Sequence, residues 1–154
     1  MFEEIYNFLA LSETLFTGGM PKAEQLTDAA QQGIQVVINL ALHDIPNALS
    51  EEEKLVKSLG MTYFNIPVVW TNPTRDNLNE FLDVMDAHSD EKILIHCEAN
   101  YRATAFPTLY RILRLGWKPE DALGIMHQIW NEEKYPIWKN FIEESIQNCG
   151  HDKN

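Results

Sequence analysis

The feature that most constrains the fold is an alternation of short apolar runs with helical patterns. Three runs have the length and composition of buried strands, and they are residues 34–40, 61–66 and 92–96. Between the last two runs, apolar residues recur at helical spacing, namely Leu78, Phe81, Leu82 and Met85. Strands that alternate with helices form a mainly parallel sheet covered on both faces, with right-handed connections. The sequence therefore predicts an α/β fold.

Turn and cap residues predict the boundaries of the other elements. A further short strand is expected at residues 14–17, and Pro21 and Gly33 are placed to begin and end the helix that follows. Ser50 to Glu53 has the pattern of a capping box, and Thr74 can cap a later helix. Helical patterns then follow the third run, up to a polar or disordered tail expected from about residue 148.

The loop between the last strand and its helix carries the most chemistry. It holds Cys97 at its start and Arg102 at its end. Backbone N–H groups converge at a strand–loop–helix junction, and the positive end of the helix dipole points to the same place. That environment binds anions and favours the thiolate form of a cysteine. The stretch predicts an anion cradle, a nucleophile and a guanidinium within one turn.

A packing role is the alternative for Cys97, because a free cysteine usually behaves as a small buried hydrophobe. Two features favour the nucleophile. Cys97 follows its strand at the carboxyl end, where open α/β sheets bind ligands, and Arg102 lies five positions later. Cys149 lies in the polar tail and is predicted to be an ordinary thiol.

His96-Cys97, a short loop and Arg102 resemble the signature of the cysteine-dependent protein tyrosine and dual-specificity phosphatases. The resemblance runs from about Thr14 to about Glu144. It implies a three-layer α/β/α fold of the dual-specificity type, with a mainly parallel sheet of roughly four to five strands. It also implies a hydrolase in which the cysteine forms a phosphocysteine and the arginine binds the phosphate.

The resemblance also implies the ligands. The expected substrates are phosphotyrosine-like or small aryl phosphomonoesters, carried by a small molecule or a phosphoprotein. Inorganic phosphate or sulfate is expected to occupy the same loop. No cofactor is expected.

The loop departs from the usual family pattern. It has four residues between Cys97 and Arg102, one fewer than usual, and it lacks the common glycines. A loop of this length is similar to that of a bacterial phosphatase-like branch of unknown function, and to that of rhodanese-type sulfurtransferases. A sulfurtransferase with a Cys97 persulfide and a non-catalytic phosphate-binding module therefore remain open as alternatives.

A general acid is the part that the sequence places least well. Related phosphatases carry an Asp on the loop after the preceding strand, but residues 67–73 contain no carboxylate. Asp76 is the nearest acid downstream, although an Asp in the first helical turn also suits the helix dipole. Asp44, on the loop after the predicted strand at residues 34–40, is the second candidate, and an ordinary turn residue is its simpler interpretation.

The remaining candidate site residues surround Cys97. Backbone N–H groups of the loop residues are expected to bind the anion, and these residues are Glu98, Ala99, Asn100 and Tyr101. Asn100 suits a positive φ, whereas the Glu98 carboxylate is unfavourable beside an anion unless it points outward. His96 is expected to be a hydrogen-bonded residue that orients the loop. The Thr104 hydroxyl can bond the thiolate or its own helix, and Trp70 is expected to be a wall of the cleft.

Composition limits the other possibilities. The 154 residues suit a single domain, residues 1–154, and a 45% hydrophobic content allows one packed core. A net charge of −11 argues against nucleic-acid and anionic-membrane partners. No apolar run is long enough to span a bilayer, and the acidic start lacks the basic region of a signal peptide. We expect a cytoplasmic protein without a metal site.

Overall fold

The computed structural model describes residues 1–42 and 51–152, with side chains described as far as residue 148. Within these ranges the centre is a five-stranded sheet of order β1-β2-β5-β3-β4. Neighbouring strands run parallel, except that β1 pairs antiparallel with β2. The strands are β1 (Leu9–Ala10), β2 (Leu15–Gly18), β3 (Val36–Asn39), β4 (Thr62–Asn65) and β5 (Ile93–His96). The prediction of a mainly parallel α/β sheet is confirmed.

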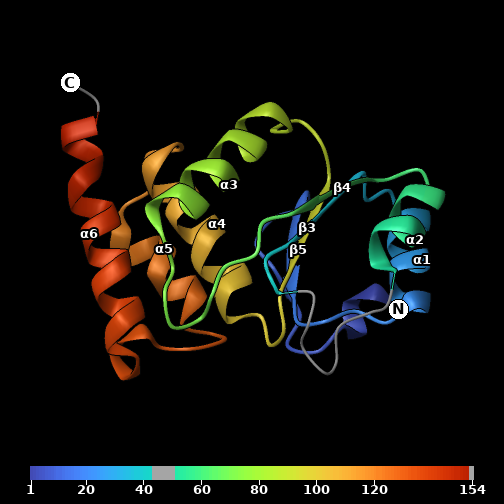
Figure 1. The fold of residues 1–154 in the computed structure, drawn as a ribbon, viewed down its shortest axis with the longest axis horizontal. Helices are drawn as coiled ribbons and strands as arrows, with labels where there is room; N and C mark the ends of the chain where they lie inside the picture. Colours follow the sequence, from blue (N-terminus) through green and yellow to red (C-terminus); the bar gives the residue numbers. More distant parts are fainter. Residues whose placement is uncertain (43–50, 153–154) are drawn as a thin grey trace.

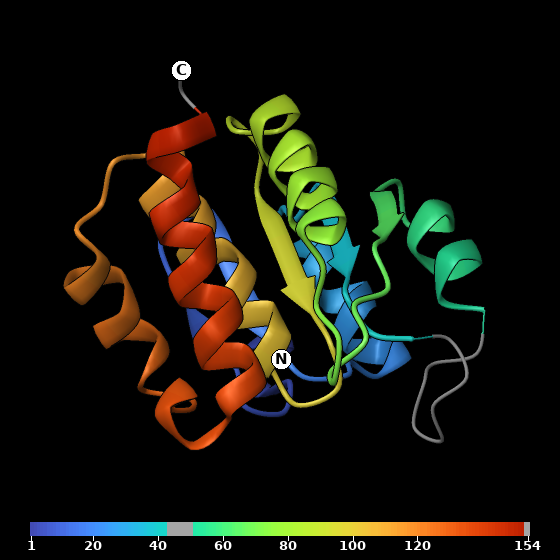
Figure 2. The same cartoon turned by 60° about the vertical axis from the view of Figure 1, so that its left-hand side comes forward.

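Helices cover both faces of the sheet, which gives three layers (Figure 1). One face carries the 3-10 turn η1 (Phe2–Glu4) and the helices α1 (Ala23–Gln31) and α2 (Glu52–Ser58). The other face carries α3 (Arg75–Ala87), α4 (Tyr101–Leu113), α5 (Pro119–Met126), η2 (Glu132–Lys134) and α6 (Pro136–Asp152). Figure 2 shows α4 between the sheet and α6, so α4 is central to the larger core.

Alternation along β5 sends neighbouring side chains to opposite faces of the sheet. Ile93 and Ile95 belong to the core under α3–α6, and Leu94 belongs to the core under α1 and α2. The alternation continues beyond the strand end. His96 faces the α2 side, where it contacts Glu52, and Cys97 packs with the larger core.

Two predicted boundaries agree with the structure. Gly33 follows α1 with φ of +97°, a conformation that glycine adopts without strain. Thr74 is the N-cap of α3 and accepts a hydrogen bond from the Asn77 N–H at 3.1 Å. The Asn77 side chain bonds back to the Thr74 N–H, which completes a capping box.

One predicted boundary differs. The N-cap of α1 is Lys22, so Pro21 lies before the helix rather than at its first position. α2 begins at Glu52, after the left-handed cap residue Glu51 with φ of 58°. The capping box expected from Ser50 to Glu53 depends on Ser50, which lies outside the described residues. The polar or disordered tail expected from about residue 148 overlaps α6, which continues to Asp152.

The first residues of the chain contain structure that periodicity did not predict. η1 has three residues and β1 has two. Both elements are too short for a helical or strand pattern of apolar residues to be recognised in the sequence. Their place is set by tertiary contacts, such as the pairing of Leu9 with Thr17. In the described parts of the chain, no helix combines the length and the apolar character needed to cross a membrane.

Candidate active site

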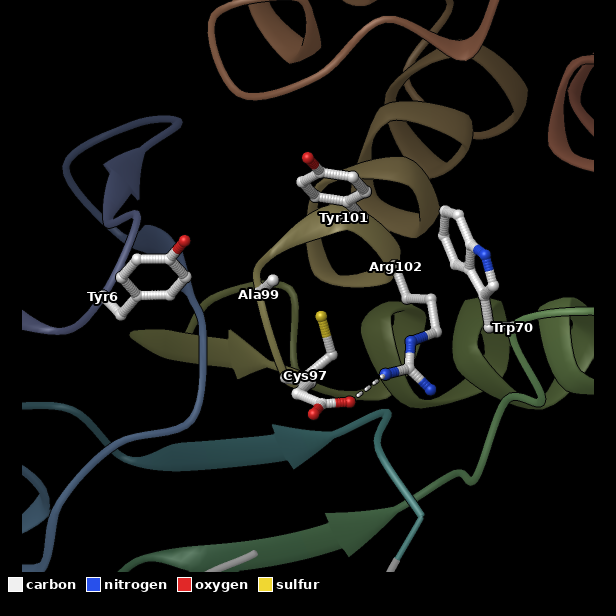
Figure 3. Close-up of a pocket in the computed structure, with 7 residues that line it drawn as sticks. Tyr6, Trp70, Cys97, Ala99, Tyr101 and Arg102 are labelled. Atoms are coloured by element: carbon white, nitrogen blue, oxygen red, sulfur yellow. Dashed lines mark ion pairs between the residues drawn. The ribbon is translucent and has the colours of Figure 1, made fainter. Parts of the chain in front are cut away.

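A cavity of about 470 Å³ lies at the carboxyl end of β5. It is lined by three segments that are far apart in the sequence, contributing Tyr6, Trp70, Cys97, Glu98, Ala99, Tyr101 and Arg102 (Figure 3). The loop from Cys97 to Arg102 provides most of this lining. Five of the predicted site residues other than Cys97 therefore gather around the thiol: Trp70, Glu98, Ala99, Tyr101 and Arg102.

Cys97 is the deepest reactive group of the cavity, with only 1% of its surface exposed. Its backbone N–H points to the Gly18 carbonyl at 3.3 Å, which continues the pairing of β5 with β2 past the end of the strand. Figure 3 shows its sulfur directed toward the space between Ala99 and Arg102. The thiol is therefore presented to whatever occupies the cavity.

The Arg102 guanidinium is held inside the protein rather than turned to solvent. Arg102 is 7% exposed, and its Nη1 donates a hydrogen bond to the Val68 carbonyl at 2.7 Å. Its Nη2 lies 4.0 Å from Oε2 of Glu98, the pair marked by the dashed line in Figure 3. A guanidinium has several N–H donors, so others remain for an anion in the cavity.

The chain lead-in and the end of β2 hold the backbone of the Cys97 loop from outside. The Glu98 carbonyl accepts a hydrogen bond from the Met20 N–H at 3.1 Å, and the Ala99 carbonyl accepts one from Nδ2 of Asn7 at 3.2 Å. In a trans peptide the carbonyl and the next N–H point in opposite directions. The Ala99 N–H therefore points away from Met20, and the first N–H groups of α4 have no acceptor within the helix.

Asn100 sets the shape of the loop instead of lining the cavity. It is the N-cap of α4 with φ of 71°, in agreement with the expectation that an Asn replaces the missing glycine. Its buried Nδ2 donates to the Asn7 carbonyl at 2.6 Å and to the Thr17 hydroxyl at 3.1 Å. These bonds tie the loop to β2 and to the lead-in.

Thr104 is buried one turn into α4 and lies outside the cavity lining. The sequence left two partners open for the Thr104 hydroxyl, the thiolate or its own helix. The structure contains the bond within the helix, in which the hydroxyl donates to the Asn100 carbonyl at 2.7 Å. The same oxygen accepts a hydrogen bond from Nε1 of Trp130 at 3.0 Å. The hydroxyl is thus used within the protein and does not reach the thiol.

His96 lies behind the loop, on the opposite face of the sheet. Its Nε2 is 2.5 Å from Oε2 of Glu52, and both side chains are buried. Nδ2 of Asn39 contacts Oε1 of Glu52 at 3.4 Å and the Tyr63 hydroxyl at 3.1 Å. Burial, followed by the nearby negative charge of Glu52, raises the pKa of Tyr63 to about 12. The sequence predicted a hydrogen-bonded histidine but not this partner, which lies 44 positions earlier.

Aromatic residues form the walls of the cavity and pack on one another. Trp70 stacks on Trp138, with ring centroids 5.2 Å apart, and its carbonyl accepts a hydrogen bond from Trp138 Nε1 at 2.7 Å. Tyr101 stacks on Trp130 at 5.0 Å with an interplanar angle of 3°. A hydrogen bond with Tyr135, followed by burial, raises the pKa of Tyr101. Trp70 and Tyr101 are therefore both held in place by packing against other aromatic residues.

Of the two predicted general acids, Asp76 is not among the described residues that line the cavity. Asp76 is exposed on the first turn of α3, where it complements the helix dipole. Asp44 lies outside the described residues. In the described part of the chain, no three His, Cys, Asp or Glu side chains gather as a metal site requires.

Tyr6 is the lining residue that sequence reasoning missed. The Tyr6 carbonyl accepts a hydrogen bond from the Gly19 N–H at 2.7 Å, which places its ring beside the loop. A Cβ at Gly19 would lie 2.7 Å from the Glu98 carbonyl, so a side chain there would push these segments apart. The Gly18-Gly19 pair was thus the available signal of a close backbone approach.

Comparison with known proteins identifies the family. Residues 7–143 match the family model described as "DSP-PTPase phosphatase fused to NAD+ Kinase". The chain belongs to this family. It is therefore a member of the cysteine-dependent protein tyrosine and dual-specificity phosphatase superfamily of hydrolases. The spacing of His96, Cys97 and Arg102 had indicated this superfamily. Among curated proteins, none matches the sequence.

Solved structures agree with this family. A candidate phosphatase (DUF442) from Shewanella putrefaciens CN-32 is 33% identical, with a TM-score of 0.85 over 96% of this chain and 95% of that one. TpbA of P. aeruginosa, solved in complex with pTyr, has a TM-score of 0.70 at 16% identity, covering 94% and 90%. The PP-IP phosphatase SIW14 from S. cerevisiae, solved with citrate, has a TM-score of 0.73 at 16% identity, covering 97% and 94%. The last two similarities establish the shared fold.

Proposed function

We propose that the protein hydrolyses phosphomonoesters through a phosphocysteine intermediate formed on Cys97. The observation that carries this proposal is the convergence of the Cys97 thiol and the Arg102 guanidinium on one cavity, at the N-terminus of α4. A thiolate attacks phosphorus, and a guanidinium with backbone N–H groups stabilises the charge on the transferring phosphoryl group. A bidentate Arg also fits two oxygens of a phosphate at once.

In the first step, the Cys97 sulfur forms a bond to phosphorus while the bond from phosphorus to the ester oxygen breaks. In the second step, water attacks phosphorus and the sulfur leaves as thiolate, which releases inorganic phosphate. Arg102 and the loop amides of Glu98, Ala99 and Tyr101 hold the equatorial oxygens in both steps. His96 and Asn100 act on this site only by positioning the loop.

Aryl phosphates are the substrates that suit the cavity walls. Tyr6, Trp70 and Tyr101 place aromatic surface around the thiol, and aromatic rings pair favourably with other rings. The carrier of the phosphate is a small molecule or a phosphoprotein. The complex of TpbA with pTyr supports the same substrate class.

A turnover experiment tests the proposal against the two other functions. The protein is assayed with para-nitrophenyl phosphate, whose leaving group needs no protonation, and separately with thiosulfate plus a thiol acceptor. Phosphate release that disappears in Cys97→Ser is the expected result. Cys97-dependent sulfur transfer without phosphate release would instead identify a sulfurtransferase. Phosphate binding without either turnover would identify a binding module.

A further inference from the structure

The cavity contains a carboxylate, although not where the family pattern places one. The loop between β4 and α3 has no acid at residues 67–73, and Asp76 is turned to solvent outside the lining. Among the described residues that line the cavity, Glu98 alone carries a carboxyl group. Its Oε2 lies 4.0 Å from Nη2 of Arg102, the guanidinium proposed to bind the phosphoryl group, so the carboxyl group is near the ester that Cys97 attacks.

The backbone of Glu98 is fixed while its side chain is free to move. The carbonyl is held by the Met20 N–H at 3.1 Å. The side chain is 44% exposed, and within the described residues its ion pair is a long contact of 4.0 Å with Nη2 of Arg102. At 4.0 Å the contact is longer than a hydrogen bond, and water screens the exposed carboxylate, so its pairing with the buried guanidinium is weak. The carboxyl group can therefore leave Arg102 at little cost and turn toward the cavity mouth.

A bound phosphoester would make the surroundings of the Glu98 carboxyl group more negative. The phosphoryl oxygens take the Arg102 guanidinium, so Glu98 loses its nearby cation and gains a neighbouring anion. Both changes favour the neutral, protonated carboxyl over the carboxylate. The side chain that is unfavourable beside an anion when ionised thus becomes a proton donor when the substrate is present.

We propose that Glu98 is the general acid and base of the reaction. In the first step, its carboxyl proton moves to the ester oxygen as the bond from that oxygen to phosphorus breaks, and the alcohol or phenol leaves. In the second step, the Glu98 carboxylate accepts a proton from water as the water oxygen bonds to phosphorus and Cys97 leaves. The two transfers cancel, and the enzyme returns to its starting state.

This proposal rests on the proposed phosphatase function, and leaving-group dependence separates the two. Glu98→Gln, Asp76→Asn and the exposed control Glu80→Gln are assayed on para-nitrophenyl phosphate and on alkyl and phenyl phosphates. We expect Glu98→Gln to lower kcat/KM on the poor leaving groups by about 100-fold and far less on the activated ester. The fall of kcat at high pH, where the acid of the enzyme–substrate complex is deprotonated, should also disappear. Glu98→Asp should recover part of the loss.

Three results would overturn the assignment of Glu98. Higher kcat/KM and tighter inhibition by inorganic phosphate in Glu98→Gln would mean that Glu98 only competes for Arg102. The leaving-group effect appearing in Asp76→Asn instead would place the acid on α3. Equal losses on every substrate, with an unchanged pH profile, would show a structural role. By contrast, absence of Cys97-dependent phosphate release in the unmodified protein would refute the phosphatase function itself.

Discussion

Two groups of polar side chains lie back to back at the carboxyl end of β5, and they are built in opposite ways. Behind the sheet, a rear cluster of Asn39, Glu52, Tyr63 and His96 is hydrogen-bonded within itself, and only the buried Nδ1 of His96 lacks a partner among the described residues. In front, the Cys97 cavity keeps its thiol and the remaining guanidinium donors directed to open space. The two neighbours His96 and Cys97 reach these regions because adjacent residues of a strand face opposite ways.

The difference separates stability from function. A buried polar group that is satisfied by the protein contributes to folding and leaves nothing for a ligand. A guanidinium whose N–H donors are only partly used by the protein can form further hydrogen bonds to an anion, so the free energy of the site falls when an anion binds. We therefore expect changes in the rear cluster to act mainly on unfolding, and changes in the cavity to act mainly on turnover.

The largest expected effect is on turnover, from Arg102→Lys. A Lys keeps the charge but lacks the planar fork that binds two phosphate oxygens, so kcat/KM should fall about 100- to 1,000-fold. Steady-state assays with para-nitrophenyl phosphate measure this. The matched control is Arg114→Lys, which changes a surface ion pair with Asp86 at 2.9 Å and should leave kcat/KM unchanged. Less than a tenfold loss in Arg102→Lys would contradict the role of the cavity.

The next effect is on stability, from Glu52→Ala in the rear cluster. Removing Glu52 leaves buried nitrogen atoms of His96 and Asn39 without this partner. The loss costs about 1–3 kcal/mol for each unsatisfied group, which urea denaturation measures. Asp86→Ala, which breaks the exposed pair with Arg114, should cost no more than about 1 kcal/mol. If Glu52→Ala kept its stability and lost turnover instead, the division between the two regions would be wrong.

A smaller effect on both stability and turnover is expected from Gly19→Ala, at the point where the Cys97 loop packs against the backbone near Tyr6. The new Cβ would lie 2.7 Å from the Glu98 carbonyl and 3.0 Å from the Tyr6 carbonyl, so backbone must move. We expect about 1–3 kcal/mol of destabilisation together with a several-fold loss of turnover. Gly124→Ala is the control, because nothing lies within 4 Å of its added Cβ and Ala favours the helix. Equal behaviour of the two variants would show that the loop is not held there.

The smallest effect is a pH dependence that sharpens the description of the rear cluster. Tyr63 has a raised pKa of about 12, against 10.0 for an ordinary tyrosine. Between these values the unfolded chain releases the proton and the folded chain keeps it, so stability falls as pH rises. Tyr63→Phe removes this contribution, and its stability should decline less steeply from pH 10 to 12. Parallel urea midpoints of the two proteins across that range would contradict a half-buried Tyr63 hydroxyl that stays neutral in the folded protein.

Sequence patterns predicted the fold and the centre of the site, because both depend on short-range signals. The Val- and Ile-rich strands, the Thr74 cap and the spacing of Cys97 and Arg102 are local features of the chain. The pairing of His96 with Glu52, the ring of Tyr6 beside the loop and the bond from Asn100 to Asn7 are not. These contacts join residues that only the tertiary fold brings together. Periodicity carries no information about them, and it likewise did not show that Asp76 lies outside the cavity.

Direct detection of the phosphocysteine tests the central claim most directly. The Cys149→Ser protein, which leaves Cys97 as its single cysteine, is mixed with para-nitrophenyl phosphate, quenched in acid within one turnover, and digested for peptide mass spectrometry. We predict that the peptide containing Cys97 gains the mass of one phosphoryl group, and that the gain is absent when Cys97 is also replaced by Ser. Phosphate release without any phosphorylated Cys97 peptide, across quench times spanning the first turnover, would contradict the account.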